Sequence, residues 1–458
     1  MNYKSSFFSS NPHFSITAEM ASRGARRSKG KKGKGGKPPL QFRLGNWLPN
    51  DPKAEERFVK DLLKEIKSLR RPLPYHPIIQ DFDRAVENHP HLKMQYTQMF
   101  TEVTHSHTPT GKPQVETYHQ MFMLVNYIMQ FYAPKFNKTD LVGFPINAIL
   151  NWSMGTINGY AAFLNEEANL HWMKVLNQWG EFLKSPASTY VLVSDQEWGW
   201  FSKDALDAMP NFVKDFECDP TDKHYGYTSW DDFFTRKFRK GVRPIAEGDN
   251  VIANACESHP YDLQYHVKLV DEFWIKEQYY SLKYMLGDDP LAAKFENGTV
   301  YQAFLSALKY HRWHSPVDGR VVRAFNVPGT YYAASLAMGE DPASPNNSQG
   351  YICQIAARAV IFIEADNKKI GLMCFVAIGM AEVSTCEIRA DLIPTATNPE
   401  PRVKKGEEIG MFHFGGSTHC LIFQPGVKLE FESNVEHLLH HPKEDGSILI
   451  NSKLATVV

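Results

Sequence analysis

The spacing of hydrophobic residues along the chain changes near residue 225. Before that point apolar residues recur three and four positions apart, which is the period of an amphipathic helix. The pattern predicts helices after Pro52, near 115–132 and over 160–184. We interpret 46–224 as a mainly helical N-terminal region, with its large aromatic residues in the core rather than in a ligand site.

After residue 225 the apolar residues fall in short runs separated by Gly, Pro, Asn and Asp. Such runs, rich in β-branched and aromatic residues, predict strands. They cover 267–275, 319–327, 359–366, 370–380 and 427–432. The spacing favours a mainly antiparallel β domain over 225–458, so the predicted fold class is α+β.

Residues 1–45 differ from both regions. The run 23–37, RGARRSKGKKGKGGK, has nothing that can bury apolar surface, so a disordered basic tail is predicted. The formal net charge of the 458-residue chain is -1, which gives no global preference for nucleic acid or an anionic surface.

The sequence also bears on the compartment. Six unclustered cysteines are typical of a reduced, intracellular protein. No apolar run reaches the roughly 18 residues of a membrane span, and no signal-peptide core is present. We therefore expect a cytoplasmic protein. Mitochondrial import is the minor alternative, because residues 1–20 are poor in acid and contain several serines.

The clearest chemical pattern lies in 406–420, GEEIGMFHFGGSTHC. Gly415 and Gly416 before Ser417 allow backbone conformations that expose the Gly416 carbonyl. The Ser417 hydroxyl can attack that carbonyl, and an N-to-O acyl shift then gives an ester. Elimination gives dehydroalanine, and hydrolysis leaves a pyruvoyl group on a new N-terminus. Taken alone, Gly-Gly-Ser-Thr is more often a turn.

A serine nucleophile needs a base, and the base needs an orienting group. His311 and His314 lie three positions apart in KYHRWHSPVDG, and one of them could reach Ser417. The candidate carboxylates are Glu257, Asp262, Asp318 and Glu382. In the alternative without catalysis, the two histidines and the HLLHHP run at 437–442 would bind a metal.

Six segments follow the order and the residues of the phosphatidylserine decarboxylases. They read DDFFTRKFRKGVRPI (231–245), WIKEQYYSLKYMLG (274–287), YHRWHSPVDG (310–319), NVPGTYY (326–332), VAIGMAEVSTCEI (376–388) and KKGEEIGMFHFGGST (404–418). Over about 225–430 the chain therefore resembles that family. From about residue 50 to 430 the chain also resembles the soluble fungal L-tryptophan decarboxylases. The segments that carry this wider resemblance are GWFSKDALDAM, HYGYTSWDDFF, ACES, FIEADNK and MFHFGGS.

The resemblance implies roles for individual residues. Ser417 would become the pyruvoyl cofactor after cleavage at 416/417. His314, the second histidine of Y-H-R-x-H, would assist processing and later proton transfer. Glu257 in ACES stands where the family has an aspartate, so the carboxylate that orients His314 would be one methylene longer. The resemblance implies no metal ligand.

These roles imply a pyruvoyl-dependent amino-acid decarboxylase. The pyruvoyl carbonyl would form a Schiff base with the substrate amine and act as electron sink, and His314 would protonate the former α-carbon. The expected reaction is the decarboxylation of an aromatic L-amino acid to its amine, and the favoured substrate is L-tryptophan, which would give tryptamine. The alternative is a phosphatidylserine decarboxylase that makes phosphatidylethanolamine.

The expected partners follow from this reaction. They are a small-molecule amino acid and the two chains produced by cleavage. No nucleic acid or membrane is expected, and homo-oligomerisation is left open.

Overall fold

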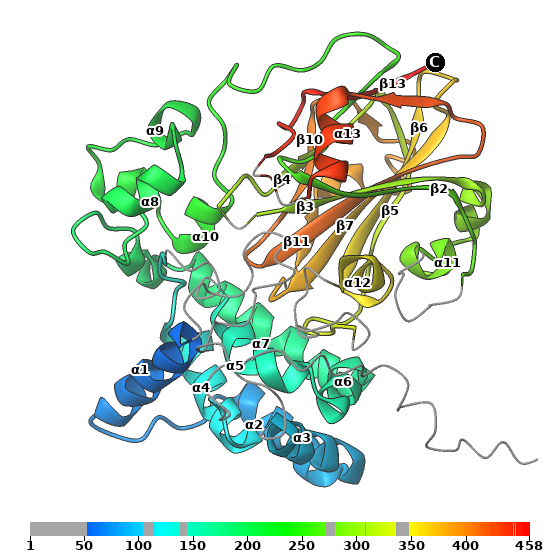
Figure 1. The fold of residues 1–458 in the computed structure, drawn as a ribbon. Helices are drawn as coiled ribbons and strands as arrows, with labels where there is room; N and C mark the ends of the chain where they lie inside the picture. The colour runs from blue at the N-terminus through cyan, green and yellow to red at the C-terminus, as the bar shows by residue number, and fades with distance from the viewer. Residues whose placement is uncertain are drawn as a thin grey trace, which may run out of the picture. The chain divides into compact units, whose positions relative to one another are not determined.

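The computed structural model describes residues 53–103, 114–137, 144–271, 280–306, 308–335, 348–383, 385–442, 444 and 446–458. The predicted basic tail at 1–45 lies outside these residues. Helices occupy the first part of the described chain and mainly antiparallel strands the second (Figure 1). This confirms the α+β fold class, whereas the domain boundary at 224/225 stays a prediction.

The helices of the first part follow the predicted periodicity. They are α1 (Ala54–Ser68), α2 (Pro77–Asn88), α3 (Pro90–Val103), α4 (Tyr118–Phe131), α5 (Pro145–Met154), α6 (Ile157–Leu164), α7 (Glu166–Lys184), α8 (Lys203–Ala208), α9 (Phe212–Asp215) and α10 (Trp230–Phe234). None of the helices in the described ranges is both long enough and apolar enough to span a bilayer.

The helix predicted over 160–184 is in fact two helices, which separate at Asn165. The backbone of Asn165 is extended (φ -68°, ψ 126°), and the Asn165 side chain accepts a hydrogen bond of 3.0 Å from the Ala168 N–H. An asparagine at this position stabilises a helix N-terminus by about 1 kcal/mol. The cap therefore begins α7 where the hydrophobic period alone would have continued one helix.

The second part contains three sheets whose strands pair antiparallel. The largest has the order β2 (His259–Val267), β3 (Gly298–Leu305), β11 (Gly416–Phe423), β7 (Leu372–Ala381), β6 (Arg358–Ala365), β5 (Gly319–Val327), β9 (Arg402–Val403). The second sheet has the order β4 (Arg312–His314), β10 (Glu408–Phe412), β8 (Cys386–Ile388). The third has the order β1 (Val251–Ala253), β13 (Lys453–Val457), β12 (Leu429–Phe431).

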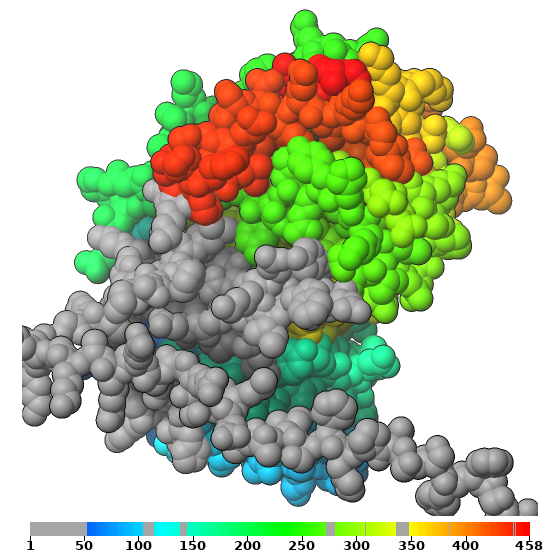
Figure 2. All heavy atoms as spheres, turned by 45° about the vertical axis from the view of Figure 1, so that its right-hand side comes forward, coloured from blue at the N-terminus to red at the C-terminus, as the bar shows by residue number. Residues whose placement is uncertain are grey.

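Three short helices accompany these sheets. They are α11 (Leu282–Met285), α12 (Gln349–Ile355) and α13 (Ser433–His440). Figure 2 shows the C-terminal residues, in orange and red, against the green residues that include β2, and α13 contacts β2 there.

Four of the five predicted strand runs correspond to β5, β6, β7 and β12. The strand predicted over 267–275 is wrong for its described part, because β2 ends at Val267. The next two backbone carbonyls accept hydrogen bonds of 3.3 and 2.9 Å from the first two N–H groups of α11, so they are not available to a sheet. Residues 272–279 lie outside the described residues.

The large sheet has two buried faces, and β11 contributes alternate side chains to each. Leu421 belongs to a core shared with β4 and β10 of the second sheet, and Cys420 belongs to a core shared with α11 and α12. By this alternation Ser417 faces the same side as Leu421. At the end where β11 begins, Phe414 joins the core of the helical region, which brings α5 and α7 against this end of the sheet (Figure 1).

Candidate active site

Ser417 is the second residue of β11 and is fully buried, with an exposed fraction of 0%. It lies opposite Leu305 of β3 and Gly379 of β7, and the register shifts between Gly416 and Ser417. The Ser417 Oγ has no hydrogen-bond partner among the described residues. A buried hydroxyl is costly to leave unpaired, so this atom fits a group that reacts rather than one that supports the fold.

Gly415 explains why the segment before Ser417 requires glycine. Its φ is +143°, and a Cβ at this position would lie 2.6 Å from both the Ala381 carbonyl oxygen and the Val383 nitrogen. No other residue fits that space or adopts that backbone readily. The close approach fixes the backbone that leads to the Gly416–Ser417 bond.

His314 is held by two side chains. Its Nδ1 donates to Asn451 Oδ1 at 3.0 Å, and its Nε2 accepts from the Tyr310 hydroxyl at 3.1 Å. Burial lowers the pKa of His314, although the bond to Asn451 acts in the opposite direction. Both ring nitrogens are thus occupied by groups other than Ser417.

His311 lies beside the residue that follows β3, the strand paired with the Ser417 end of β11. It is fully buried, its ring stacks on Phe234 at 3.9 Å, and the Ser306 backbone beside it follows the residue opposite Ser417. Neither ring nitrogen forms a well-aligned hydrogen bond among the described residues. Burial, with a smaller contribution from the Arg236 charge, lowers the pKa of His311 to about 3. His311 is therefore neutral, and its ring nitrogens have only poorly aligned contacts with the Phe234 and Ser306 backbones among the described residues.

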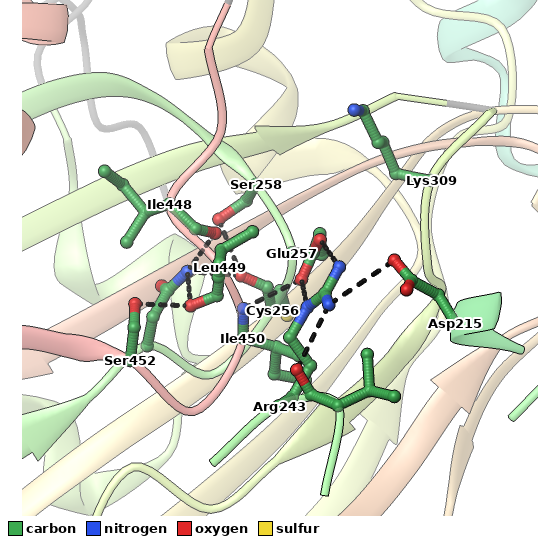
Figure 3. A network of polar contacts seen from close by, with 12 residues as sticks. Asp215, Arg243, Cys256, Glu257, Ser258, Lys309, Ile448, Leu449, Ile450 and Ser452 are labelled. Carbon is green, nitrogen blue, oxygen red and sulfur yellow. Dashed lines mark hydrogen bonds and ion pairs between the residues drawn. The ribbon is translucent and has the colours of Figure 1, made fainter. Parts of the chain in front are cut away.

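Glu257 is paired with Arg243 of the R-P-I segment (Figure 3). Arg243 Nε and Nη2 donate to the two carboxylate oxygens at 3.0 and 2.7 Å, and the Ile450 N–H donates to Glu257 Oε2 at 2.9 Å. Arg243 Nη1 also lies 3.8 Å from Asp215 Oδ2. The Glu257 side chain is 5% exposed and the Arg243 side chain 15%, so Glu257 and Arg243 form a largely buried ion pair.

This network reaches His314 through the next residue along the chain. Asn451 follows Ile450, donates from Nδ2 to the Arg243 carbonyl at 3.3 Å and accepts from His314 at 3.0 Å. Its φ is +66°, a left-handed conformation that asparagine tolerates better than most residues. The structure thus connects Glu257 to His314 through Asn451 and not by the direct contact that the family aspartate suggested.

The other candidate carboxylates have different partners. Asp318 accepts from the Lys405 N–H at 3.0 Å and lines a surface cavity that none of the candidate serine and histidine residues lines. Asp262 accepts from the Leu263 N–H at 2.8 Å. Glu382 accepts from the Asn147 N–H at 2.5 Å.

Sequence reasoning missed His419. It lies two residues after Ser417 on β11, so the alternation of a strand places both on one face. Its ring is fully buried, 6.2 Å from Tyr301 and 5.9 Å from Phe375, with neither nitrogen partnered among the described residues. Burial lowers the pKa of His419 to about 3. The period of two in Ser-Thr-His was the signal that could have identified it.

Within the described residues, no three His, Cys, Asp or Glu side chains converge as a metal site. His437 instead bonds Glu444 at 2.8 Å, away from the ring contacts of His311 and His314.

Comparisons with known proteins agree with the six sequence segments. Family models for phosphatidylserine decarboxylase match residues 76–209 and 230–440. The chain is 37% identical over 445 residues to an L-tryptophan decarboxylase of Psilocybe cyanescens, which covers 92% of this chain and 95% of that protein. It is 40% identical over 313 residues to decarboxylase iboD of Amanita muscaria (strain Koide BX008), which covers 64% and 87%. A phosphatidylserine decarboxylase proenzyme of Chlamydia felis is 31% identical over 209 residues, which covers 46% and 64%.

Proposed function

This chain belongs to the phosphatidylserine decarboxylase family, and from that premise we propose that it cleaves itself between Gly416 and Ser417 and decarboxylates an aromatic L-amino acid, L-tryptophan. Membership makes it a decarboxylase, and the cofactor in this proposal is a pyruvoyl group derived from Ser417. The observation that carries the proposal is the buried Ser417 Oγ, which has no partner among the described residues and follows a backbone that only glycine permits.

The proposed self-cleavage uses atoms that are already adjacent. The Ser417 Oγ attacks the carbonyl carbon of Gly416, the C–N bond between the two residues breaks, and the acyl group passes to oxygen. A base removes the hydroxyl proton, and the nitrogen of residue 417 is protonated as the C–N bond breaks. Removal of the Cα proton of residue 417 then expels the Gly416 carboxylate and leaves dehydroalanine, whose imine tautomer takes up water and releases ammonia to give the pyruvoyl group. When formed, the pyruvoyl group supplies the electron sink for the charge left by departing CO2.

Two histidines are candidates for the proton transfers in this proposal. His311, which is neutral and has no well-aligned hydrogen bond among the described residues, is one candidate for the base that acts on Ser417. His314, which the family resemblance assigns to this step, stays the other candidate, with its tautomer fixed by Asn451 and Tyr310. A histidine at either position can return a proton to the α-carbon after CO2 leaves.

Self-cleavage is expected to keep its rate as the pH falls from 7.5 to 5.5. Burial lowers the pKa of both His311 and His314, so the neutral imidazole that accepts the proton persists below 6.5. A histidine of ordinary pKa would lose roughly 90% of this form at pH 5.5. Cell-free synthesis, transfer to buffers of each pH and mass spectrometry of the 417–458 fragment give the rate.

Variants then identify the base. His311→Gln or His314→Gln should slow cleavage sharply, whereas His437→Gln, at an exposed site, should not. A wild-type rate that halves near pH 6.5 would contradict the buried base, and so would wild-type rates in both variants.

The substrate part of the proposal rests on the relatives and on the helical region. The relatives named L-tryptophan decarboxylase match both the helices and the β domain, and the Chlamydia proenzyme matches less than half of this chain. Helical aromatic side chains surround the segment before Ser417: Phe144 stacks on Phe414 at 5.8 Å, and Trp179 meets it edge-on at 5.1 Å. Apolar walls of this kind suit an aromatic side chain better than a lipid headgroup.

Purified protein is expected to convert L-tryptophan to tryptamine without added pyridoxal phosphate. Its kcat/KM should exceed that for L-phenylalanine by roughly 10- to 200-fold, the range that a difference of 1–3 kcal/mol in an apolar pocket produces. Amines and CO2 from a panel of amino acids and phosphatidylserine vesicles measure this. Borohydride added with substrate should abolish turnover, because the reagent reduces carbonyl groups.

Phosphatidylserine is the second candidate substrate, because the family models and the Chlamydia relative carry that name. Turnover of phosphatidylserine vesicles together with no turnover of any free amino acid would replace the tryptophan proposal with the lipid reaction.

A further inference from the structure

Four buried polar side chains near the start of β11 carry atoms that have no hydrogen-bond partner among the described residues. Asn147 and Asn151 belong to α5, Tyr332 follows β5 and Glu382 follows β7. Their exposed fractions are 0%, 0%, 0% and 2%. Both amide atoms of each asparagine, the Tyr332 hydroxyl and Glu382 Oε2 are unpaired. Buried polar groups normally have partners, so a concentration of unpaired ones indicates a place that receives polar atoms from elsewhere.

Glu382 contacts the backbone of α5 and lies close enough to Tyr332 for its charge to act on the phenol. Its Oε1 accepts from the Asn147 N–H in the first turn of α5, and Asn151 lies one turn further on the same helix face. Burial, and after it the charge of Glu382, raises the pKa of Tyr332. Three segments that are distant in sequence therefore contribute to one polar cluster.

The cluster adjoins the bond that we propose is cleaved. Ala381, which precedes Glu382, is the register partner of Gly416, and the backbone at 381–383 lies against Gly415. Glu382 has a φ of +64°, a left-handed conformation that a glutamate adopts at a cost in energy. Such strain is concentrated at functional sites, and here it directs a carboxyl group away from the sheet toward α5.

Aromatic rings surround the polar atoms. Tyr332 meets Trp172 edge-on at 5.0 Å and Phe163 at 6.0 Å, and Phe144 at the start of α5 stacks on Phe414. A few polar groups within apolar and aromatic walls are typical of a small-molecule site. An aromatic ring that carries one polar atom has the chemistry that such surroundings bind.

The charge of the cluster narrows the ligand further. Burial raises the pKa of Glu382 well above its usual value, although backbone N–H groups of Asn147 and Ile146 act against this. Burial thus favours the uncharged form of Glu382, and in that form a carboxyl group, two amides and a phenol can both donate and accept hydrogen bonds. A phosphate headgroup would need cations in such a place, whereas a heterocyclic N–H would not.

We propose that Asn147, Asn151, Tyr332 and Glu382 recognise the ring N–H of a heteroaromatic amino-acid substrate. The proposal rests on the proposed decarboxylase function and adds the residues that select the side chain. It also gives the helical region a role, because two of the four groups come from α5.

The test compares L-tryptophan with 1-methyl-L-tryptophan, in which a methyl group replaces the ring hydrogen. Wild-type enzyme should prefer L-tryptophan in kcat/KM by roughly 10- to 100-fold, because the methylated ring leaves buried polar atoms unpaired. Asn151→Leu should reduce that preference toward about one while the 417–458 fragment still forms. Asn88→Leu, at the exposed end of α2, is the matched control and should keep the wild-type ratio.

Tyr332→Phe keeps the ring packing and removes one hydroxyl. If Asn151→Leu does not fold, the kcat/KM ratio of L-tryptophan to 1-methyl-L-tryptophan is measured in Tyr332→Phe instead, and the same reduction is expected. Equal use of both substrates by the wild type, or an unchanged ratio in a fully processed variant, would overturn the recognition site and leave the decarboxylase proposal standing. If processed wild-type protein converts no amino acid, the proposed function itself fails, and this site with it.

Discussion

Ser417→Ala is expected to remain a single chain of 458 residues and to have no decarboxylase activity. The substitution removes the only atom placed to attack the Gly416 carbonyl from the adjacent residue, and without it neither the acyl shift nor the pyruvoyl group can form. Ser417 Oγ has no hydrogen bond to lose within the described residues, so the fold should be retained.

Intact-mass analysis measures this outcome. The wild type should give fragments 1–416 and 417–458, the second with a blocked N-terminus, and Ser417→Ala should give neither. Ser306→Ala is the matched control, because Ser306 is close in space and its side chain has no role in the proposed chemistry. A wild-type protein that is fully active at full length would refute self-cleavage.

Glu257→Gln is expected to slow self-cleavage by about tenfold or more, since small displacements of a catalytic group cost up to about 100-fold. It should also destabilise the fold by about 1–3 kcal/mol, because Arg243 loses its bidentate charged partner and keeps only the longer contact with Asp215. The neutral amide weakens the hold on the Ile450 N–H and on Asn451, which orients His314. Glu257→Asp keeps the charge and should recover part of the rate.

Stability and rate must be separated in this test. Urea unfolding in a Ser417→Ala background gives the loss of stability without interference from cleavage. Asp289→Asn is the matched structural control, because Asp289 is a buried carboxylate 3.0 Å from Arg323 and has no connection to His314. It should lose stability without slowing cleavage. If Glu257→Gln cleaves at the wild-type rate, His314 is oriented by Asn451 and Tyr310 without help from the ion pair.

The sequence by itself determined the features whose physics is local. A helical period after Pro52 and over 160–184 and strand runs at 319–327 and 370–380 predicted the elements, because side chains three, four or two positions apart share a face wherever they occur. It also located the candidate reaction, since the attacking hydroxyl of Ser417 and the Gly416 carbonyl belong to adjacent residues. The break at Asn165 was a local signal too, but a single cap is easily hidden within a long hydrophobic period.

Only the tertiary structure decided which groups surround the candidate site residues. The Glu257–Ile450 hydrogen bond spans 193 residues and the His314–Asn451 bond spans 137, and neither Ile450 nor Asn451 belongs to a pattern that marks such a role. Glu382 was one of four equivalent carboxylates in the sequence, until the structure placed its oxygen on a backbone N–H 235 residues away. Periodicity indicates which face of an element is buried but not what that face is buried against. For that reason the sequence predicted the candidate reaction but not the residues that surround the reacting groups.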